Sequence, residues 1–173
     1  PLKGFDLDHV YSSWDIFGFG GRITTEGPAV VFDDTGTFEA ISVADKLLEQ
    51  GMKVTFVSRY ESLGASLPYP PATVEAAKER LMSQDFDFIG GHYLQAITDD
   101  EVLIGVPFTE RMRTLSAKTV VLVTYNHPNR ELGDYLKEQL PEMSEKIHTV
   151  GDASGTNGIM DAIHQSANLI RAL

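Results

Sequence analysis

The chain of 173 residues contains no cysteine, and this absence excludes several kinds of chemistry. Disulfide bonds, thiol catalysis and cysteine-ligated zinc or iron–sulfur sites cannot form within these residues. Positive charge is also scarce, because 14 lysines and arginines stand against 25 acidic residues and the formal net charge is -11. Nucleic acids and anionic membrane surfaces bind basic surfaces, so we expect neither as a partner.

Long apolar runs and catalytic motifs are missing as well. No run approaches the ~20 residues of a membrane span, and no pattern marks a signal peptide, so we expect a cytoplasmic protein. The motifs G-x-S-x-G and H-E-x-x-H and the Walker loop are absent, and the histidines show no metal-ligand spacing. We therefore predict no catalytic residue and no metal site.

What is present is an alternation of apolar strands and amphipathic helices. A βαβ unit runs from Ala29 to Ser58, with a first strand that is apolar throughout, a helix at 38–50 and a strand at 53–58. Gly51 stands where a left-handed residue ends a helix. The remaining predicted elements are a helix from Pro71 to about Gln84, strands at 86–89 and 119–124, two strand-like pieces in 92–115 around Asp99-Asp100, a helix at about 130–140, a strand at 147–150 and a helix from about Gly158 to Leu173.

This order of elements predicts an α/β fold of the Rossmann-like, three-layer kind, with a parallel sheet, a small β-meander and a C-terminal helix. We expect helices on both faces of the sheet. Residues 1–27 show little periodicity but carry Tyr11, Trp14, Phe17 and Phe19 among glycines. They form either an irregular arm packed on the domain or an interdomain crossing whose aromatic side chains contact a neighbour. We predict that Trp14 and its aromatic neighbours are partly exposed or lie in a subunit contact.

A glycine-rich loop is missing between the first strand and its helix, where a dinucleotide-binding domain has one. Such a loop needs glycine at three positions, which here hold Asp33, Thr35 and Phe38, with Gly36 between them. A side chain at Thr35 would block the approach of a pyrophosphate, and Phe38 would fill the contact between helix and strand. Asp33 and Asp34 add repulsion of ~3 kcal/mol for each carboxylate–phosphate pair at ~5 Å and an effective dielectric of ~20.

Two interpretations of this loop remain open. In the first, the side chain of Asp34, Thr35 or Thr37 caps the helix and no nucleotide binds. In the second, the loop retains altered nucleotide binding, with Gly36 and Thr37 at the helix N-terminus as cofactor-binding residues.

The end of the second strand offers two further candidates, Ser58 and Arg59. An arginine at this place is compatible with the 2′-phosphate of NADP, but it is also common as a solvated surface residue. A third interpretation compares the two aspartates of the loop with the Mg²⁺ pocket of receiver domains. That pocket also needs an aspartate after the third strand and a lysine after the fifth. Here Ile89-Gly90-Gly91 end the third strand, and Lys118 precedes its strand.

Taken together, four segments resemble the C-terminal part of a known class of flavin oxidoreductases. This class comprises trimethylamine dehydrogenase and 2,4-dienoyl-CoA reductase and is related to Old Yellow Enzyme. The segments that carry the resemblance, in order along nearly the whole chain, are Val10–Asp15, Val30–Gly36, Thr119–Thr124 with Pro128–Leu132, and Val150–Ala153.

The resemblance implies a longer parent protein with an N-terminal (β/α)₈ barrel that holds FMN and a cysteine-ligated [4Fe–4S] cluster. Residues 1–27 would form an aromatic interdomain arm, and 28–145 a degenerate NAD(P)-binding-like Rossmann domain. Residues 146–173 would be the terminal strand and helix of an adjoining FAD- or ADP-type domain. Gly151 and Asp152 match the motif that contacts the diphosphate region of the flavin or ADP. A start at Pro1 rather than methionine agrees with a piece of a longer chain.

We therefore expect a largely non-catalytic C-terminal domain that docks on the FMN barrel, with a homodimer as a further option. No cofactor is expected to bind tightly within these residues, and ADP or NADP are the candidates for weaker binding. A second hypothesis is a competent NADP(H)- or ADP-binding domain that delivers reducing equivalents and uses Arg59. A third is a receiver-like Mg²⁺ module.

Overall fold

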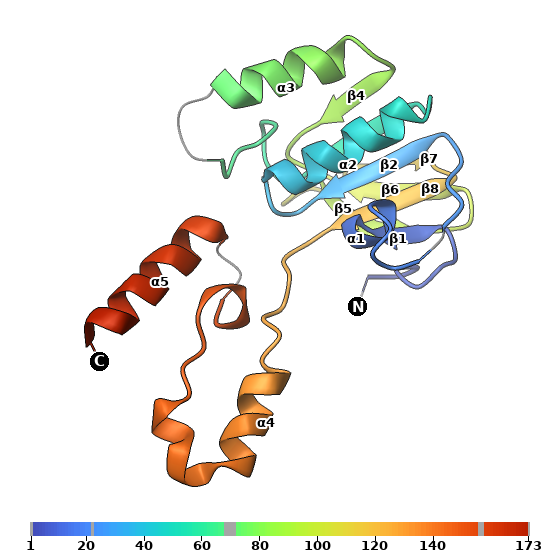
Figure 1. Cartoon of the computed structure of the whole chain (residues 1–173). Helices are drawn as coiled ribbons and strands as arrows, with labels where there is room; N and C mark the ends of the chain where they lie inside the picture. The colour runs from blue at the N-terminus through green and yellow to red at the C-terminus, as the bar shows by residue number, and fades with distance from the viewer. Residues whose placement is uncertain (1, 22, 68–71, 156–157, 173) are drawn as a thin grey trace. The chain divides into compact units, whose positions relative to one another are not determined.

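The computed structural model describes residues 2–21, 23–67, 72–155 and 158–172 (Figure 1). The chain divides into two compact units, 1–124 and 125–173, which are considered separately below. This division falls earlier in the chain than the boundary at 146 that the sequence suggests.

The N-terminal unit is built on a sheet of five parallel strands in the order β1-β8-β2-β3-β4. Strand β2 lies in the centre and is buried at every position, as its apolar sequence predicts. The register places Asp33 at the end of β2 beside Ser58 at the end of β3. The five strands are β1 (Val10–Ser12), β2 (Ala29–Asp33), β3 (Val54–Ser58), β4 (Phe86–Ile89) and β8 (Thr119–Val123).

One face of this sheet is covered by helix α2 (Phe38–Glu49) and helix α3 (Ala72–Met82). The buried side of α2 carries Ile41, Ala44 and Leu47 at helical spacing, and these pack in one cluster with residues of β2 and β3. Gly51 has φ +80 and follows the C-cap residue Gln50, which confirms the predicted left-handed end.

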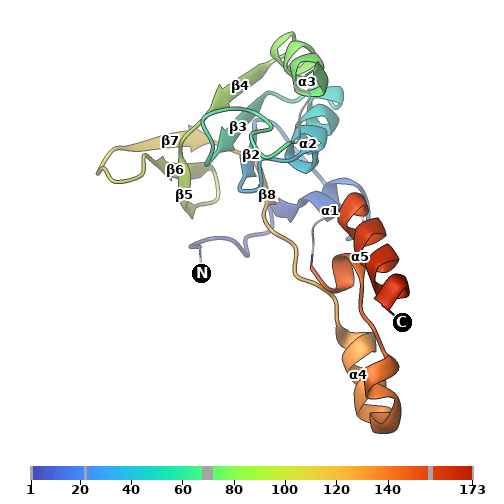
Figure 2. The same ribbon diagram turned by 90° about the vertical axis from the view of Figure 1, so that its left-hand side faces the viewer.

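The other face is covered by a meander and not by helices, so the expectation of helices on both faces is wrong for the described residues (Figure 2). The meander has one more strand than predicted, because β7 continues it after the turn at 106–111. Apolar side chains of the meander pack against the face of the sheet that carries Val30 and Phe32. Its strands are β5 (Tyr93–Ile97), β6 (Glu101–Gly105) and β7 (Met112–Ser116). The three-layer α/β fold is thus confirmed.

Residues before Ala29 contribute more to the sheet than an irregular arm would. Strand β1 pairs in parallel with β8, Val10 opposite Val120, and extends the sheet at one edge. A short helix, α1 (Ser13–Ile16), follows it directly. Whether this segment also crosses to another domain stays a prediction.

The C-terminal unit contains helix α4 (Glu131–Gln139), 3₁₀ turns at Pro141–Lys146 and Gly151–Ala153, and helix α5 (Ile159–Ala172). The predicted strand at 147–150 is wrong, because this stretch is extended but belongs to no sheet. Among the described residues of this unit only Gly151 is buried. None of the described helices of the chain has the length and apolarity that a membrane crossing requires.

Candidate functional site

The candidate site lies at the carboxyl end of the parallel sheet, in the loop between β2 and α2. Ligands of open α/β sheets bind at this end of the strands. Because β2 and β3 pair in register, the loop residues Asp33 and Asp34 lie beside Ser58 and Arg59 of the neighbouring strand end. The structure thus brings together the polar residues that the sequence indicated at these two strand ends.

Asp33 is fully buried and accepts four hydrogen bonds within the chain. Its Oδ1 accepts from the backbone amides of Thr35 at 3.0 Å and Gly36 at 2.8 Å, and from the Thr35 hydroxyl at 3.1 Å. Its Oδ2 accepts from the hydroxyl of Ser58 at 3.1 Å. Backbone amides at such a strand-to-helix turn are the groups that hold phosphate in a nucleotide-binding loop. In this chain the carboxylate of Asp33 occupies two of them.

Of the side-chain caps that the first interpretation names, the one by Thr37 is absent, and among the described backbone amides only that of Thr37 itself donates to the Thr35 hydroxyl, at 3.4 Å. Thr37 is the N-cap residue, and its side chain makes no capping hydrogen bond. Its hydroxyl lies 2.9 Å from that of Thr35 instead. The loop is therefore ordered by Asp33 from the strand side and not by a cap from the helix side.

Gly36 keeps the backbone freedom of a nucleotide-loop glycine, but the chain itself fills the space beside it. The residue has φ +68, and a Cβ there would lie 2.7 Å from the Ser66 Oγ and 3.0 Å from the Ser66 amide nitrogen. The Ser66 amide donates to the Gly36 carbonyl at 2.9 Å. The close approach that this glycine permits is thus made to the segment after β3.

The guanidinium of Arg59 has two neighbours within the chain, Asp34 and Tyr60. Its Nη1 lies 3.2 Å from Asp34 Oδ1, and its guanidinium lies 5.7 Å from the centre of the Tyr60 ring. Half of the Arg59 side chain remains exposed, and an ion pair of this kind contributes only about 0–1 kcal/mol. Ser58 is fully buried, with its hydroxyl bonded to Asp33 and to the amide of Tyr60. Contact of either residue with a ligand stays a prediction.

The other two candidates, Gly151 and Asp152, lie in the C-terminal unit. Gly151 has φ +66, and a Cβ on it would lie 3.2 Å from the Cβ of Ala162 in α5. Its amide donates to Gln165 Oε1 at 2.9 Å. Asp152 Oδ1 accepts from the amide of Gly158 at 3.3 Å, just before α5 begins. The glycine thus allows the turn to contact α5 closely, and a role in ligand binding stays a prediction.

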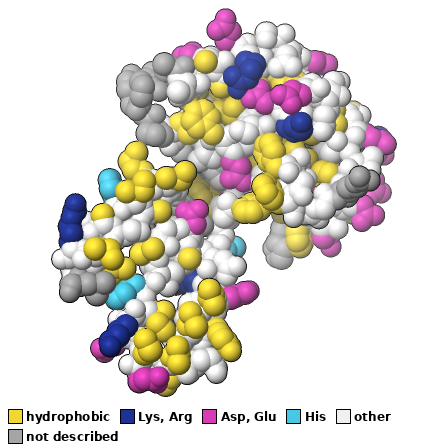
Figure 3. Space-filling model, viewed as in Figure 1, with side chains coloured by type: hydrophobic (Ala, Val, Ile, Leu, Met, Phe, Trp, Pro, Cys, Tyr) yellow, Lys and Arg dark blue, Asp and Glu magenta, His cyan; other side chains and the backbone are white. Residues whose placement is uncertain are grey.

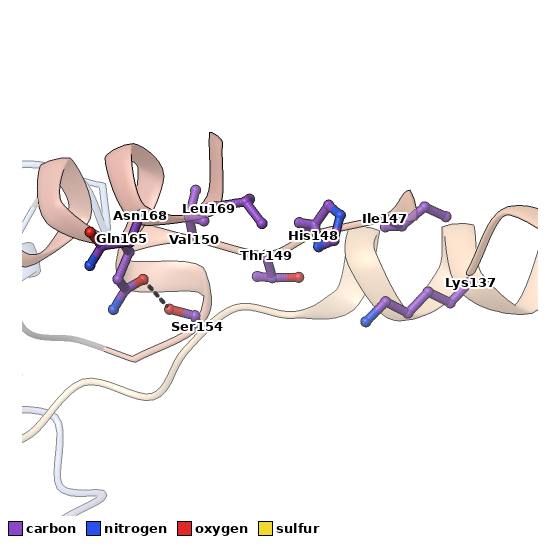
Figure 4. Close-up of a pocket in the computed structure, with 9 residues that line it drawn as sticks. All are labelled: Lys137, Ile147, His148, Thr149, Val150, Ser154, Gln165, Asn168 and Leu169. Carbon is purple, nitrogen blue, oxygen red and sulfur yellow. Dashed lines mark hydrogen bonds between the residues drawn. The ribbon is translucent and has the colours of Figure 1, made fainter. Parts of the chain in front are cut away.

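Beside this turn lies a groove of about 590 Å³ that the sequence did not indicate (Figure 4). It follows the extended stretch 147–150, and Ser154 Oγ donates to Gln165 Oε1 at 2.7 Å at one end of it. No periodic pattern connects these positions, because the groove depends on how α5 folds back on the chain. Its lining residues are Lys137, Ile147, His148, Thr149, Val150, Ser154, Gln165, Asn168 and Leu169.

In the part of the chain that the structure describes, no three or more histidine, aspartate or glutamate side chains lie together in a group that could hold a metal ion. Each described histidine is thus without such a group of neighbours.

No protein-family model matches the sequence, and no curated protein matches it. Solved structures do match. The 6-hydroxypseudooxynicotine amine oxidase of Pseudomonas geniculata N1 is 26% identical over 94% of this chain, with a TM-score of 0.80. Histamine dehydrogenase of Rhizobium sp. 4-9 is 20% identical over 97%, with a TM-score of 0.81. A 2-naphthoyl-CoA reductase is 21% identical over 94%, with a TM-score of 0.76.

The chain has the fold of one part of the trimethylamine dehydrogenase-like flavoproteins. The resemblance predicted from the sequence is confirmed. The chain spans about a quarter of the solved chains, 24%, 26% and 23% of their lengths. A bacillithiol disulfide reductase of Bacillus cereus shares the fold more distantly, with 17% identity over 75% of this chain, 37% of that chain and a TM-score of 0.57. The chain therefore resembles a domain of larger oxidoreductases.

Proposed function

We propose that the chain is a structural, largely non-catalytic domain of a flavin-dependent oxidoreductase whose FMN and [4Fe–4S] cluster lie in a separate barrel domain. The observation that carries the proposal is the buried carboxylate of Asp33. It takes the two loop amides that a phosphate would need, and it carries the same sign of charge as that phosphate. The residues present therefore do not fit a dinucleotide at this loop. Neither do they fit an iron–sulfur cluster, since the chain has no cysteine.

The burial pattern of the C-terminal unit supports a second part of the proposal, that residues 146–173 complete an adjoining FAD- or ADP-type domain. Helix α5 exposes Ile159, Met160, Ile163 and Ile170, although its apolar residues recur at helical spacing. Among the described residues, the backbone groups of His148 and Thr149 form no hydrogen bond with another backbone group. An extended stretch with unpaired backbone and a helix with an uncovered apolar face are what one strand and one helix of an incomplete α/β domain show.

The remaining boundaries are proposed from the resemblance and not from the compact units, which divide after Thr124. Residues 28–145 form the degenerate NAD(P)-binding-like domain, and 1–27 lead into it from the preceding part of the polypeptide. A homodimer of the whole protein is part of the proposal and can be tested by analytical ultracentrifugation.

One observation favours the alternative of a competent NADP(H)-binding domain. Arg59 is half exposed, and its ion pair with Asp34 is weak enough for a 2′-phosphate to compete with it. ADP could bind instead at Gly151 and Asp152. The Mg²⁺ hypothesis is less well supported, because both oxygens of Asp33 already accept hydrogen bonds from the chain.

Isothermal titration calorimetry with NADP(H), NAD(H), ADP and Mg²⁺ tests these alternatives. We expect no micromolar binding of any of the four. Micromolar NADP(H) binding that disappears in Arg59→Ala would overturn the structural assignment in favour of the second hypothesis. Mg²⁺ binding that disappears in Asp34→Asn would favour the third, and this partly exposed carboxylate can be changed without removing the buried one. The flavin assignment is tested by the absorption spectrum of the complete gene product that contains this chain.

A further inference from the structure

The N-terminal unit carries an exposed aromatic surface formed by Trp14, Phe17 and Phe19. These side chains are 55%, 45% and 75% exposed, and the rings of Trp14 and Phe19 meet edge to face with centroids 5.5 Å apart. Figure 3 shows hydrophobic side chains gathered over α1 on this face of the unit. The same unit has two well-packed cores on the two faces of its sheet. The aromatic surface is therefore not the exposed half of an unfinished core.

The backbone that carries this surface is held firmly by the unit. Ser12 and Asp15 form a reciprocal capping box at the start of α1, with hydrogen bonds of 2.7 and 2.8 Å to the Asp15 carboxylate. The Ser13 hydroxyl donates to Glu39 at the start of α2. The amide of Phe19 donates to the carbonyl of Trp14 at 2.9 Å. Because the rings are placed in advance, a partner would bind them without a large loss of conformational entropy.

The chemistry of the surface points to protein and not to lipid. Between Val10 and Gly21 the only charged residue is Asp15, whose carboxylate already accepts from Ser12. An anionic lipid surface would require basic residues beside the aromatic rings, whereas the chain carries a net charge of -11. An apolar, uncharged protein surface matches these side chains.

The size of the surface points to a tethered partner and not to a second copy. With roughly 200 Å² per aromatic side chain, the exposed fractions amount to about 350 Å², well below the ~800 Å² per partner of a stable complex between separate molecules. A domain on the same polypeptide needs far less area, because tethering gives it a high effective concentration. The similar solved chains are about four times as long as the stretch they share with this chain, and therefore have further domains.

We propose that Trp14, Phe17 and Phe19 form the docking face for a neighbouring domain of the same polypeptide, which contacts them with an apolar, uncharged surface. This inference rests on the proposed function, since it requires a larger protein. It adds which face of the domain makes the contact.

Hydroxyl-radical footprinting with mass spectrometry tests the proposal on the 173-residue chain and on the complete gene product. Trp14, the only tryptophan in this chain, is expected to be modified rapidly in the former. In the complete product we expect about fivefold slower modification, the ratio of 55% exposure to that of a side chain only roughly 10% exposed inside an interface.

Variants supply the matched control. In the complete product Phe19→Ser is expected to restore rapid modification of Trp14 and to speed proteolysis between the domains. Phe108→Ser removes an equally apolar and fully exposed ring from the β6–β7 turn of the same unit. This variant is expected to change neither the modification of Trp14 nor the rate of proteolysis between the domains. The urea midpoint of the 173-residue chain should be the same for Phe19→Ser as for the original sequence, which shows that folding is intact.

Three results would overturn the docking face. Equal modification of Trp14 in the two forms of a flavin-containing product would refute it and leave the proposed function standing. Protection of Trp14 in the 173-residue chain that grows with protein concentration would assign the surface to a second copy. A complete gene product with no further domain and no flavin would refute the proposed function as well.

Discussion

Replacing Asp33 tests the central structural claim, that a buried carboxylate holds the loop between β2 and α2. Asp33→Ala removes the acceptor of four hydrogen bonds in a fully buried place. The hydroxyls of Thr35 and Ser58 retain other neighbours, Thr37 and Tyr60 respectively. The two backbone amides lose their only acceptor, and they account for most of the expected cost.

The magnitude follows from these two amides. A hydrogen bond to a charged group contributes about 1.5–3 kcal/mol, so the pair amounts to about 3–6 kcal/mol. Part of this is offset, because the variant no longer has to desolvate a carboxylate. We expect Asp33→Ala to lower the free energy of unfolding of the N-terminal unit by about 3 kcal/mol. With a urea m-value of about 2 kcal/mol/M, the midpoint falls by about 1.5 M.

Two further variants serve as controls in the same urea titration, followed by the fluorescence of Trp14. Asp33→Asn keeps an oxygen for the two amides and loses only the charge, so we expect a cost of about 1 kcal/mol. Asp34→Asn breaks a half-exposed ion pair and should change stability by less than about 0.5 kcal/mol. If Asp33→Ala were no more destabilising than Asp34→Asn, the carboxylate could not be what orders the loop.

Three other properties can be tested independently. Phe108 has φ +63 at the β6–β7 turn, so Phe108→Gly should raise the free energy of unfolding by about 0.5–1 kcal/mol, whereas Phe108→Ala, which keeps the strain, should not. The Lys118 ammonium lowers the pKa of Asp100 below its ordinary 3.8, and Asp100 raises the pKa of Lys118 above 10.5, in each case chiefly through their hydrogen bond. The free energy of unfolding should thus differ between the original chain and Lys118→Met from about pH 4 to pH 10. The difference should vanish below this range, where Asp100 is protonated, and above it, where Lys118 loses its charge. A difference that stays constant over all pH values would contradict the prediction. Limited proteolysis should remove the C-terminal unit first and leave a resistant fragment ending near Thr124, since only Gly151 is buried among that unit's described residues; early cuts within β2 or α2 would contradict this.

The apolar pattern was enough to predict the central strand and helix of the N-terminal unit but not all of the strand pairs in its sheet. The uninterrupted run of β2 and the helical spacing of α2 are local signals, and both elements were confirmed. The pairing of β1 with β8 joins residues about a hundred positions apart, which no local pattern encodes. The stretch 147–150 shows the converse, because a strand-like sequence becomes a strand only when a neighbouring strand pairs with it.

The sequence by itself determined that the loop after β2 lacks the glycines of a nucleotide site and carries acidic residues in their place. Only the tertiary structure decided what those residues do. Parallel pairing of β2 and β3 brings the hydroxyl of Ser58 to Asp33, and the segment after β3 folds onto Gly36. Hydrogen bonds of this kind depend on distances across the sheet, which are set by packing and not by spacing along the chain. They make Asp33 an acceptor for the amides and hydroxyls of its own chain.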